Sequence, residues 1–413
     1  MGAAAETAER FRLRRTGSGE TYTWREFVEA YRSGVFQAEA DVMLEVDFDY
    51  GFIRQSFGRA ALSCEAPGIF AAWPLLPLGG PHDLVSLGEG STPLIRTRRR
   101  EDGVHAYIKN EAQNPTGSFK DRYDCVSVNV ARRMGYRRVA CASTGNHALA
   151  VAAYAAAAGM SCVAIVSDRA SPQVLATLKA YGAETLVVPP AGRFEELGRK
   201  AKEGCFPVGL HMPGPTGNPF GVEGYKTIAY EIHRQLGKAP DAVVFPCARG
   251  NGLYGTWKGC LELKTLGLAD ALPRMYACQP EAAASLVKAY ETGADGPVLV
   301  EARDTVADAT CEAISSRAAL DAIRASGGGA IALGEEEIIA AMLALARTGI
   351  FAEPSSAMAW AGMEELIRRG EIRGGEEAVV VVTSTGFKTG RATLDRITGE
   401  EAAGGAPQGG RKK

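Results

Sequence analysis

The stretch RVACASTGNHALAVAAYAAAAGMSCVAIVSDRASPQVLATLKAYGAETLVVP, residues 138–189, decides the fold. Short apolar runs alternate in it with longer helical patterns, and glycines follow both helical segments, as they often do at helix ends. The strand runs lack polar alternation, which indicates a parallel sheet covered by helices on both faces. We predict strands at 138–142, 161–166 and 185–189, and helices at 148–158 and 171–181.

Three later runs have the same apolar character, at residues 241–246, 275–279 and 378–383. Strands that alternate with helices indicate βαβ units, so the predicted fold class is α/β with doubly wound parallel sheets. Residues 1–60 differ, because they lack a clear period. We expect them to be an extension that packs on the main body or on a second subunit. The tail, residues 396–413, has few large apolar side chains, and we expect it to be disordered.

The composition excludes several classes of function. The 413 residues contain 46 Lys and Arg against 48 Asp and Glu, a formal net charge of −2. This balance gives no electrostatic basis for binding nucleic acid or an acidic membrane surface. The nine cysteines form no CxxC pair and the five histidines no zinc-binding spacing, so we expect reduced thiols and no metal. With neither a signal peptide nor a membrane span expected, we predict a cytoplasmic protein that acts on a small molecule.

The first of three glycine-containing turns is NPTGSFKDR, residues 114–122. It leads into a helical pattern in which Ser118 is a plausible N-cap and Lys120 falls in the first turn. The helix dipole disfavours positive charge there and lowers the pKa of the amine, as a nucleophilic or Schiff-base lysine requires. The alternative is an ordinary surface lysine.

The second turn, STGNH at residues 143–147, follows the predicted strand 138–142. Backbone N–H groups and two hydroxyls at a helix N-terminus suit a carboxylate. The alternative is that Ser143 or Thr144 only caps the helix.

The third turn, ARGNGLYG at residues 248–255, lies between a predicted strand and a helix expected to begin near Thr256. Glycines at such a junction bring backbone donors against a phosphate. Together the three turns describe one site at the carboxyl edge of a parallel sheet: an imine-forming lysine, a carboxylate cradle and a phosphate cradle. Pyridoxal phosphate needs these elements when it acts on an amino acid.

Motifs in family order resemble the fold-type II (tryptophan synthase β-like) pyridoxal-phosphate enzymes, and threonine synthases most closely. They are LGEGSTPLI (87–95), NPTGSFKDR (114–122), STGNH (143–147), NPFGVEGYKTIAYEI (218–232), PCARGNGLYGTWKG (246–259), EPSSA (353–357) and TSTGFK (383–388). The resemblance implies two doubly wound parallel-sheet domains with pyridoxal 5′-phosphate between them, and a homodimer. The expected boundaries are 1–60 for the extension, 61–130 with 218–395 for the large domain, 131–217 for the small substrate-binding domain and 396–413 for the tail.

The resemblance also assigns roles. Lys120 would bind the cofactor as a Schiff base and act as acid and base at Cα and Cβ. Asn146 would bond the phenolic oxygen, and Thr383, or its neighbour Ser384, would face the pyridine nitrogen. A hydroxyl there leaves that nitrogen unprotonated, which suits elimination and replacement. The substrate carboxylate would contact Ser143, Thr144, Asn146 and His147, and the cofactor phosphate Gly250, Asn251, Gly252, Leu253 and Tyr254.

Departures from the family pattern gather around the substrate. His147 stands where threonine synthases usually have Thr or Ser, and GNH is commoner in serine/threonine dehydratases and diaminopropionate lyase. Arg249 is unusual in the cofactor loop, where it would meet an anionic group or form a structural ion pair. A phosphorylated substrate needs a second anion site, for which the candidate donors are Ser91, Thr92, Arg122, Lys226 and Lys388.

The leading hypothesis is a threonine synthase-like lyase that converts O-phosphohomoserine to threonine and phosphate. One alternative is β-replacement on O-phosphoserine or a similar substrate, as in cysteate synthases. Another is a serine or threonine dehydratase or an ammonia lyase. A non-catalytic binding protein that retains the fold is a different class, and the intact motif around Lys120 argues against it.

Overall fold

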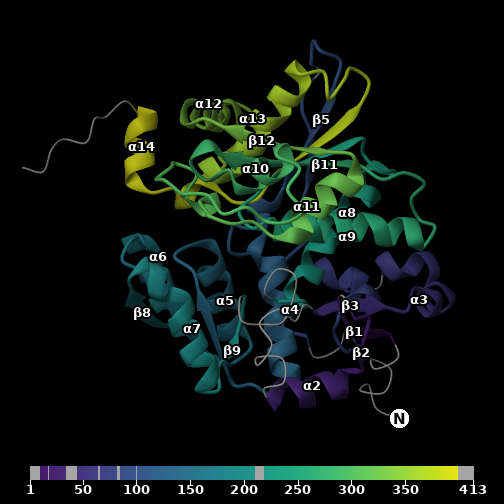
Figure 1. Ribbon diagram of the computed structural model, residues 1–413, viewed down its shortest axis with the longest axis vertical. Helices are drawn as coiled ribbons and strands as arrows, with labels where there is room; N and C mark the ends of the chain where they lie inside the picture. The colour runs from purple at the N-terminus through teal and green to yellow at the C-terminus, as the bar shows by residue number, and fades with distance from the viewer. Residues whose placement is uncertain are drawn as a thin grey trace, which may run out of the picture.

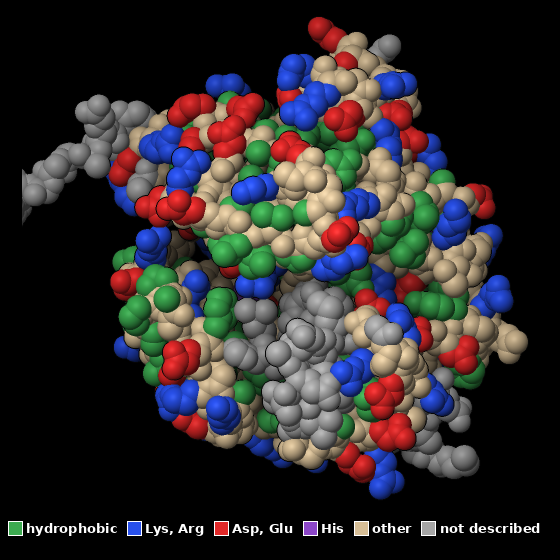
Figure 2. Space-filling view, viewed as in Figure 1, with side chains coloured by type: hydrophobic (Ala, Val, Ile, Leu, Met, Phe, Trp, Pro, Cys, Tyr) green, Lys and Arg blue, Asp and Glu red, His purple; other side chains and the backbone are tan. Residues whose placement is uncertain are grey.

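The computed structural model describes residues 10–16, 18–33, 44–63, 66–80, 84–98, 100–209 and 218–398. Two parallel sheets with their helices form the upper and lower left parts of the molecule in Figure 1, and a small antiparallel sheet lies at the lower right. On the described part of the face in Figure 2, basic and acidic side chains are interspersed, as the near-neutral balance predicts.

The largest sheet has the strand order β12-β11-β10-β13-β5-β4 and is parallel except for β4 at its edge. Its strands are β4 (Leu94–Arg96), β5 (His105–Asn110), β10 (Ala242–Pro246), β11 (Arg274–Pro280), β12 (Gly329–Leu333) and β13 (Glu377–Val382). Alternate residues of β10 enter different cores: Val243 and Phe245 pack with α8 and α9, and Val244 packs with α12 and α13. This alternation confirms a doubly wound sheet. These helices are α8 (Gly221–Leu236), α9 (Asn251–Thr265), α12 (Glu335–Arg347) and α13 (Pro354–Arg368).

The second parallel sheet has the order β8-β7-β6-β9. It contains β6 (Arg138–Ala142), β7 (Ser161–Ser167), β8 (Glu184–Val188) and β9 (Phe206–Pro207), with α5 (Asn146–Ala157), α6 (Pro172–Ala180) and α7 (Arg193–Lys202). All five elements predicted between residues 138 and 189 are confirmed, within two residues at each end. Helix α4 (Lys120–Arg133) packs against both α5 and α8, so it lies between the two sheets (Figure 1).

The N-terminal region forms a three-stranded antiparallel sheet in the order β2-β1-β3. Its elements are β1 (Phe11–Arg15), β2 (Thr21–Tyr22), α2 (Trp24–Arg32), β3 (Leu44–Phe48), α3 (Tyr50–Ser56) and the short helices η1 (Gly58–Leu62) and η2 (Gly68–Leu75). Tyr50 donates to Glu262 of α9 at 2.8 Å, and Tyr254 of α9 donates to Glu45 of β3 at 2.7 Å. These bonds confirm that this region packs on the main body.

The remaining described helices connect or follow the sheets. They are η3 (Glu111–Gln113), η4 (Pro190–Gly192), η5 (Glu281–Ala283), α10 (Ser285–Glu291), η6 (Asp308–Thr310), α11 (Arg317–Ser326), η7 (Gly386–Lys388) and α14 (Arg391–Thr398). Residues 396–398, expected to be disordered, therefore belong to a helix, because α14 continues past the predicted boundary; residues 399–413 lie outside the described residues. Within the described ranges, no helix is both long enough and apolar enough to cross a bilayer.

Candidate active site

The turn that carries Lys120 is fastened to the carboxyl end of β13. The amide of Phe119 donates to the carbonyl oxygen of Thr383 at 2.8 Å. The hydroxyl of Ser384 donates to the carbonyl oxygen of Gly117 at 3.1 Å. These bonds place Lys120, the first residue of α4, at the edge of the large sheet where ligands bind in open α/β folds.

Lys120 is half-buried among aromatic rings. Its Nζ lies 4.6 Å from the ring centroid of Phe119 and 6.0 Å from that of Tyr225. Burial lowers the pKa of Lys120, and the nearby carboxylates of Asp124 and Glu353 offset only part of this shift. Burial is thus the largest cause, rather than the helix dipole used in the sequence argument. A lowered pKa makes the neutral, nucleophilic amine available.

The second turn leaves the N-terminus of α5 open. Gly145 occupies the N-cap position, and no side chain of the described residues caps the helix there. The hydroxyl of Ser143 instead accepts from the amide of Gly145 at 3.3 Å. The alternative that Ser143 or Thr144 only caps the helix is therefore wrong. Open first-turn amides beside two hydroxyls suit a carboxylate.

Asn146, the first residue of α5, joins the two parallel-sheet parts of the molecule. Its Nδ2 donates to the two carboxylate oxygens of Glu353 at 3.1 and 3.2 Å, and its Oδ1 accepts from the hydroxyl of Ser384 at 3.3 Å. Burial raises the pKa of Glu353. Glu353 was not predicted at the site, although the motif EPSSA contains it. The available signal was an acidic residue directly before a helix-starting proline.

The two hydroxyl residues expected to face the pyridine nitrogen lie at the same edge. Thr383 and Ser384 are both buried at the end of β13. The hydroxyl oxygens of Thr383 and Ser356 are 2.7 Å apart, and Ser356 also accepts from the amide of Ser384 at 2.8 Å. Ser356 is therefore a partner that orients this pair, and the sequence analysis did not single it out.

The third turn brings backbone close to the site. Gly250 has a φ of 85°, in the left-handed region that favours glycine, and a Cβ there would lie 2.3 Å from the Cβ of Ala319. A Cβ on Gly252 would lie 2.7 Å from the ring of Phe119. No side-chain cap covers the start of α9 among the described residues. This uncapped helix start, with glycines in front of it, fits a phosphate group.

The sequence predicted that this helix begins near Thr256, but helix α9 begins at Asn251. Its glycines pack against neighbouring elements and do not form a loop. The side chain of Leu253 is fully buried. Tyr254 directs its hydroxyl to Glu45, and its amide is already bonded within the helix. Of the five residues predicted at the cofactor phosphate, these last two therefore direct their side chains elsewhere.

Arg249 forms a loose ion pair beside this loop. Its Nε lies 3.7 Å from a carboxylate oxygen of Glu312, and its guanidinium lies 6.0 Å from the ring centroid of Phe194 in α7. Both charged side chains are about one-third exposed, so the pair contributes roughly 0–1 kcal/mol. The ion pair is observed, and its weakness leaves Arg249 able to meet an anionic ligand.

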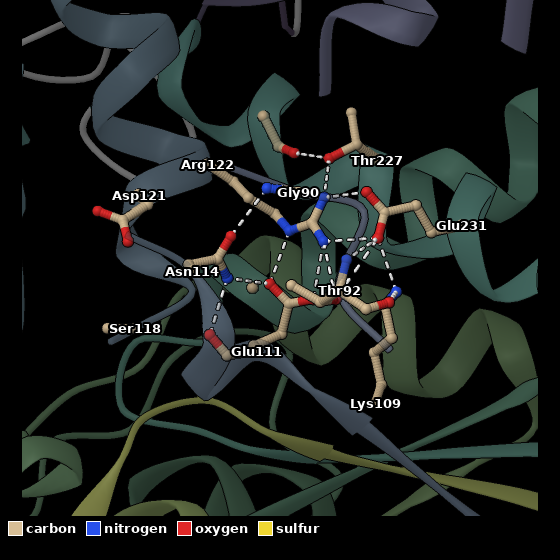
Figure 3. A network of polar contacts seen from close by, with 12 residues as sticks. Gly90, Thr92, Lys109, Glu111, Asn114, Ser118, Asp121, Arg122, Thr227 and Glu231 are labelled. Atoms are coloured by element: carbon tan, nitrogen blue, oxygen red, sulfur yellow. Dashed lines mark hydrogen bonds and ion pairs between the residues drawn. The ribbon is translucent and has the colours of Figure 1, made fainter. Parts of the chain in front are cut away.

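Two of the expected phosphate donors, Thr92 and Arg122, belong to a buried network that includes α4 (Figure 3), and the exposed Ser91 joins it through its backbone amide. Arg122 donates to Glu111 at 2.6 Å and to Glu231 at 2.7 Å. The Thr92 hydroxyl donates to Glu111 at 2.6 Å, and the Ser91 amide donates to Glu231 at 2.8 Å. The side chains of Thr92 and Arg122 are therefore bonded within this network and do not enter the site with Lys120.

Two lysines complete the paired charges of this region. Burial disfavours ionisation of Glu231, but Arg122 and Lys109 together lower its pKa; Lys109 lies 2.6 Å from it. Lys226, also expected at the phosphate, is fully buried between Glu223 at 2.6 Å and Glu262 at 2.8 Å. Its ammonium is paired inside the protein and does not face the site.

Lys388 contacts the turn that carries Lys120. Its Nζ donates to the carbonyl oxygen of Thr116 at 3.0 Å, and burial lowers its pKa. A cavity of about 90 Å³ adjoins it. The lining residues are Thr116, Leu149, Gln173, Val174, Thr177, Tyr181 and Lys388. This cavity extends from the turn before Lys120 toward α6.

His147 lies in the first turn of α5. Its Nδ1 is 3.0 Å from a carboxylate oxygen of Asp124, and its Nε2 is 3.3 Å from the carbonyl oxygen of Val208. Asp124 is completely buried on α4, one turn after Lys120. Asp124 could not be found from the sequence, since a single carboxylate within a helix gives no local signal.

Comparisons with known proteins identify the family of this chain. The family described as pyridoxal-phosphate dependent enzyme matches residues 85–384. The threonine synthase of Methanocaldococcus jannaschii is 35% identical over 87% of this chain and 90% of its own, and that of Methanosarcina acetivorans is 36% identical over 84% and 86%.

Solved structures share the fold. Threonine deaminase isoform 2 from Solanum lycopersicum matches with a TM-score of 0.62 and 22% identity over 75% of this chain and 88% of its own. Maize serine racemase matches with a TM-score of 0.64 and 19% identity over 75% and 92%. The family match spans all three turns that converge on Lys120, and the chain therefore belongs to the pyridoxal-phosphate-dependent enzymes.

Proposed function

We propose that this chain is a carbon–oxygen lyase of the threonine-synthase type, which converts O-phosphohomoserine and water into threonine and phosphate. The observation that carries the proposal is the meeting of Lys120, the open start of α5 and the glycine-lined start of α9 at neighbouring sheet edges. Relatives named threonine synthase, 35% and 36% identical over most of the chain, support this substrate class.

The residues present fit pyridoxal 5′-phosphate. The cofactor supplies an electron sink for negative charge that develops at the substrate α-carbon. Its phosphate would lie at the uncapped N-terminus of α9, whose backbone Gly250 and Gly252 hold in place by packing closely against Ala319 and Phe119. Asn146, oriented by Glu353, would meet its phenolic oxygen, and the hydroxyl of Thr383 would face its pyridine nitrogen, with Ser384 as the replacement.

Lys120 would hold the cofactor and move protons at Cα and Cβ of the substrate, because its lowered pKa lets the amine both accept and release a proton. The open amides at the start of α5, with Ser143, Thr144 and His147, would hold the substrate carboxylate. Partial burial among Phe119 and other aromatic side chains would limit access of water.

The distal phosphate would lie toward Lys388 and its cavity, with Arg249 as a second cation released from its weak pair. A charge-assisted bond to phosphate contributes about 1.5–3 kcal/mol. The second candidate is β-replacement on O-phosphoserine, whose phosphate would use the same cations, Lys388 and Arg249. His147 in place of a hydroxyl residue favours a serine or threonine dehydratase as a third.

Supplying O-phosphohomoserine, O-phosphoserine, serine and threonine separately to the purified holoenzyme tests these proposals. We expect phosphate and threonine from O-phosphohomoserine, and no product from Lys120→Ala. Phosphate from O-phosphoserine alone would replace threonine synthesis with β-replacement, and keto acid from serine or threonine would indicate a dehydratase. Failure to transform any of the four would favour the binding-protein class.

The homodimer and the cytoplasmic location stay predictions. The first rests on the family resemblance and the second on cysteine usage; of the eight cysteines that the structure describes, seven are buried. Light scattering of the holoenzyme at several concentrations tests the dimer.

A further inference from the structure

The ring of His147 is held between two oxygen acceptors. Nδ1 lies 3.0 and 3.1 Å from the two carboxylate oxygens of Asp124, and Nε2 lies 3.3 Å from the carbonyl oxygen of Val208. The Tyr123 ring meets the imidazole edge-on, with centroids 5.9 Å apart. The side chain of His147 is 17% exposed and that of Asp124 is not exposed at all, so the carboxylate has no contact with bulk water.

These contacts require one more proton than a neutral imidazole and a free carboxylate carry. A neutral imidazole has a single N–H, so one ring nitrogen would face an oxygen lone pair without a donor. A proton added to the ring, or to Asp124, gives both contacts a donor. Burial raises the pKa of Asp124, with His147 and Lys120 opposing it, so the buried carboxylate favours keeping such a proton nearby.

Apart from His147, few groups near the Asp124 carboxylate can balance its negative charge. The titratable groups that interact with Asp124 are Lys120 and Asp121 on α4, Tyr123 beside it, Cys141 on β6, His147 on α5 and Tyr225 on α8. A bare negative charge here, next to the start of α5, would repel a substrate carboxylate. The added proton removes this repulsion where the substrate would bind.

We propose that Asp124 and His147 share one proton and that Asp124, as a positioning residue, makes His147 a cationic anchor for the carboxylate of the amino-acid substrate. This inference rests on the proposed function, in which the start of α5 binds that carboxylate. On binding, Nε2–H turns from the Val208 carbonyl to the ligand, the shared proton stays on the ring, and Asp124 is left ionised against it. No other bond forms or breaks.

The test uses the holoenzyme and L-2-aminobutyrate, an amino acid without a leaving group, compared with its primary amide, which lacks the carboxylate. Dissociation constants are measured by equilibrium dialysis. We expect Asp124→Asn and His147→Gln each to reduce the preference for the acid over the amide about tenfold, because a charge-assisted hydrogen bond becomes a neutral one. In the double variant the preference for the acid should fall no further than in either single variant, since the pair acts as one unit.

Proton NMR of the same proteins gives a readout independent of ligand binding. The wild type should show a low-field imidazole N–H resonance that disappears in His147→Gln and moves upfield in Asp124→Asn. Tyr123→Phe, which keeps the ring contact and leaves the pair intact, should match the wild type in both measurements. Unchanged cofactor absorbance confirms that each variant is folded.

Two results would overturn the proposal: an unchanged carboxylate preference in Asp124→Asn, or a wild type without the low-field resonance. Its failure is distinguishable from failure of the proposed function. Carboxylate preference that depends on the pair, together with no threonine from O-phosphohomoserine, supports the anchor and rejects that substrate. Threonine formation with an unchanged preference in Asp124→Asn rejects the anchor and keeps the substrate.

Discussion

The side-chain amide nitrogen of Asn146, Nδ2, donates hydrogen bonds to both carboxylate oxygens of Glu353, at 3.1 and 3.2 Å. Asn146 is the first residue of α5 and Glu353 directly precedes α13. These helices pack on different sheets, so the contact joins the two parts of the molecule at the site. It fixes which end of the Asn146 amide faces Ser384. The same carboxylate acts on Lys120, because its charge favours the protonated amine.

The first prediction follows from that charge. Burial lowers the pKa of Lys120 below its ordinary value of 10.5, and Glu353 raises it. Glu353→Gln removes the negative charge, so the pKa falls further and the neutral amine is present at lower pH. The rate at which apoprotein takes up pyridoxal phosphate, followed by stopped-flow absorbance, should reach its plateau at lower pH than in the wild type.

The matched control is Glu364→Gln, the same chemical change within α13, at a residue that pairs with Arg100 away from the site. Its uptake profile should overlay that of the wild type. A profile for Glu353→Gln that stays in place or moves to higher pH would mean that Glu353 is not charged beside Lys120.

The second prediction concerns the backbone at Gly250. An alanine there meets Ala319 and must adopt a positive φ, so the start of α9 has to move. We expect Gly250→Ala to weaken pyridoxal-phosphate binding at least about tenfold, the equivalent of 1.4 kcal/mol. Gly237→Ala is the control, since Gly237 has a φ of 75° with nothing within 4 Å of the added Cβ. It should cost about 1 kcal/mol of stability and leave cofactor affinity unchanged.

The third prediction separates a structural role of Arg122 from a substrate role. Arg122→Met leaves the buried carboxylates of Glu111 and Glu231 without their main partner, so the free energy of unfolding should fall by ~3–5 kcal/mol. Urea unfolding measures this loss. Arg317→Met, which removes an exposed pair with Asp321, should change stability by less than about 1 kcal/mol. Normal stability with a raised KM for phosphorylated substrate alone would return Arg122 to the substrate site.

The parallel strands could be predicted from the sequence because strands that are buried on both faces are nearly continuous apolar runs. The sequence did not predict the N-terminal sheet, whose strands β1 and β3 are short and mix buried residues such as Phe11 and Leu13 with exposed charges. It also placed the start of α9 five residues too late, since Gly252 and Gly255 resemble a loop. In the structure these glycines allow the helix to approach Phe119 and α8 closely.

The site residues also fall into two groups: those whose position depends on the local sequence and those whose partners come from distant elements. The position of Lys120 at the start of a helix could be predicted because it depends on a contiguous turn. Arg122, two residues later, has the same appearance in the sequence as a ligand-binding cation. Only folding brings Glu111 and Glu231, 11 and 109 residues away, against its guanidinium. Asp124 and Glu353 were missed for the same reason, since their partners come from other elements.

The fourth prediction tests Lys388 as the remaining lysine of the expected phosphate donors. Replacing it with Gln removes the positive charge beside the cavity and keeps an N–H donor for the Thr116 carbonyl. We expect the KM for the phosphorylated substrate to rise about tenfold with kcat little changed, because the contact exists before and during the reaction. The affinity for L-2-aminobutyrate, which has no phosphate, should stay the same.

Lys238→Gln is the control for this charge change. Lys238 is 62% exposed and pairs with Glu377 at the amino end of β13, at the opposite end of the strand from Thr383, so its loss should not affect KM. If Lys388→Gln weakens the binding of the phosphorylated substrate and of L-2-aminobutyrate equally, the Lys388 side chain supports the turn before Lys120 and does not bind the phosphate. An unchanged KM for the phosphorylated substrate would shift the anion site to Arg249, where Arg249→Gln should then show the tenfold rise.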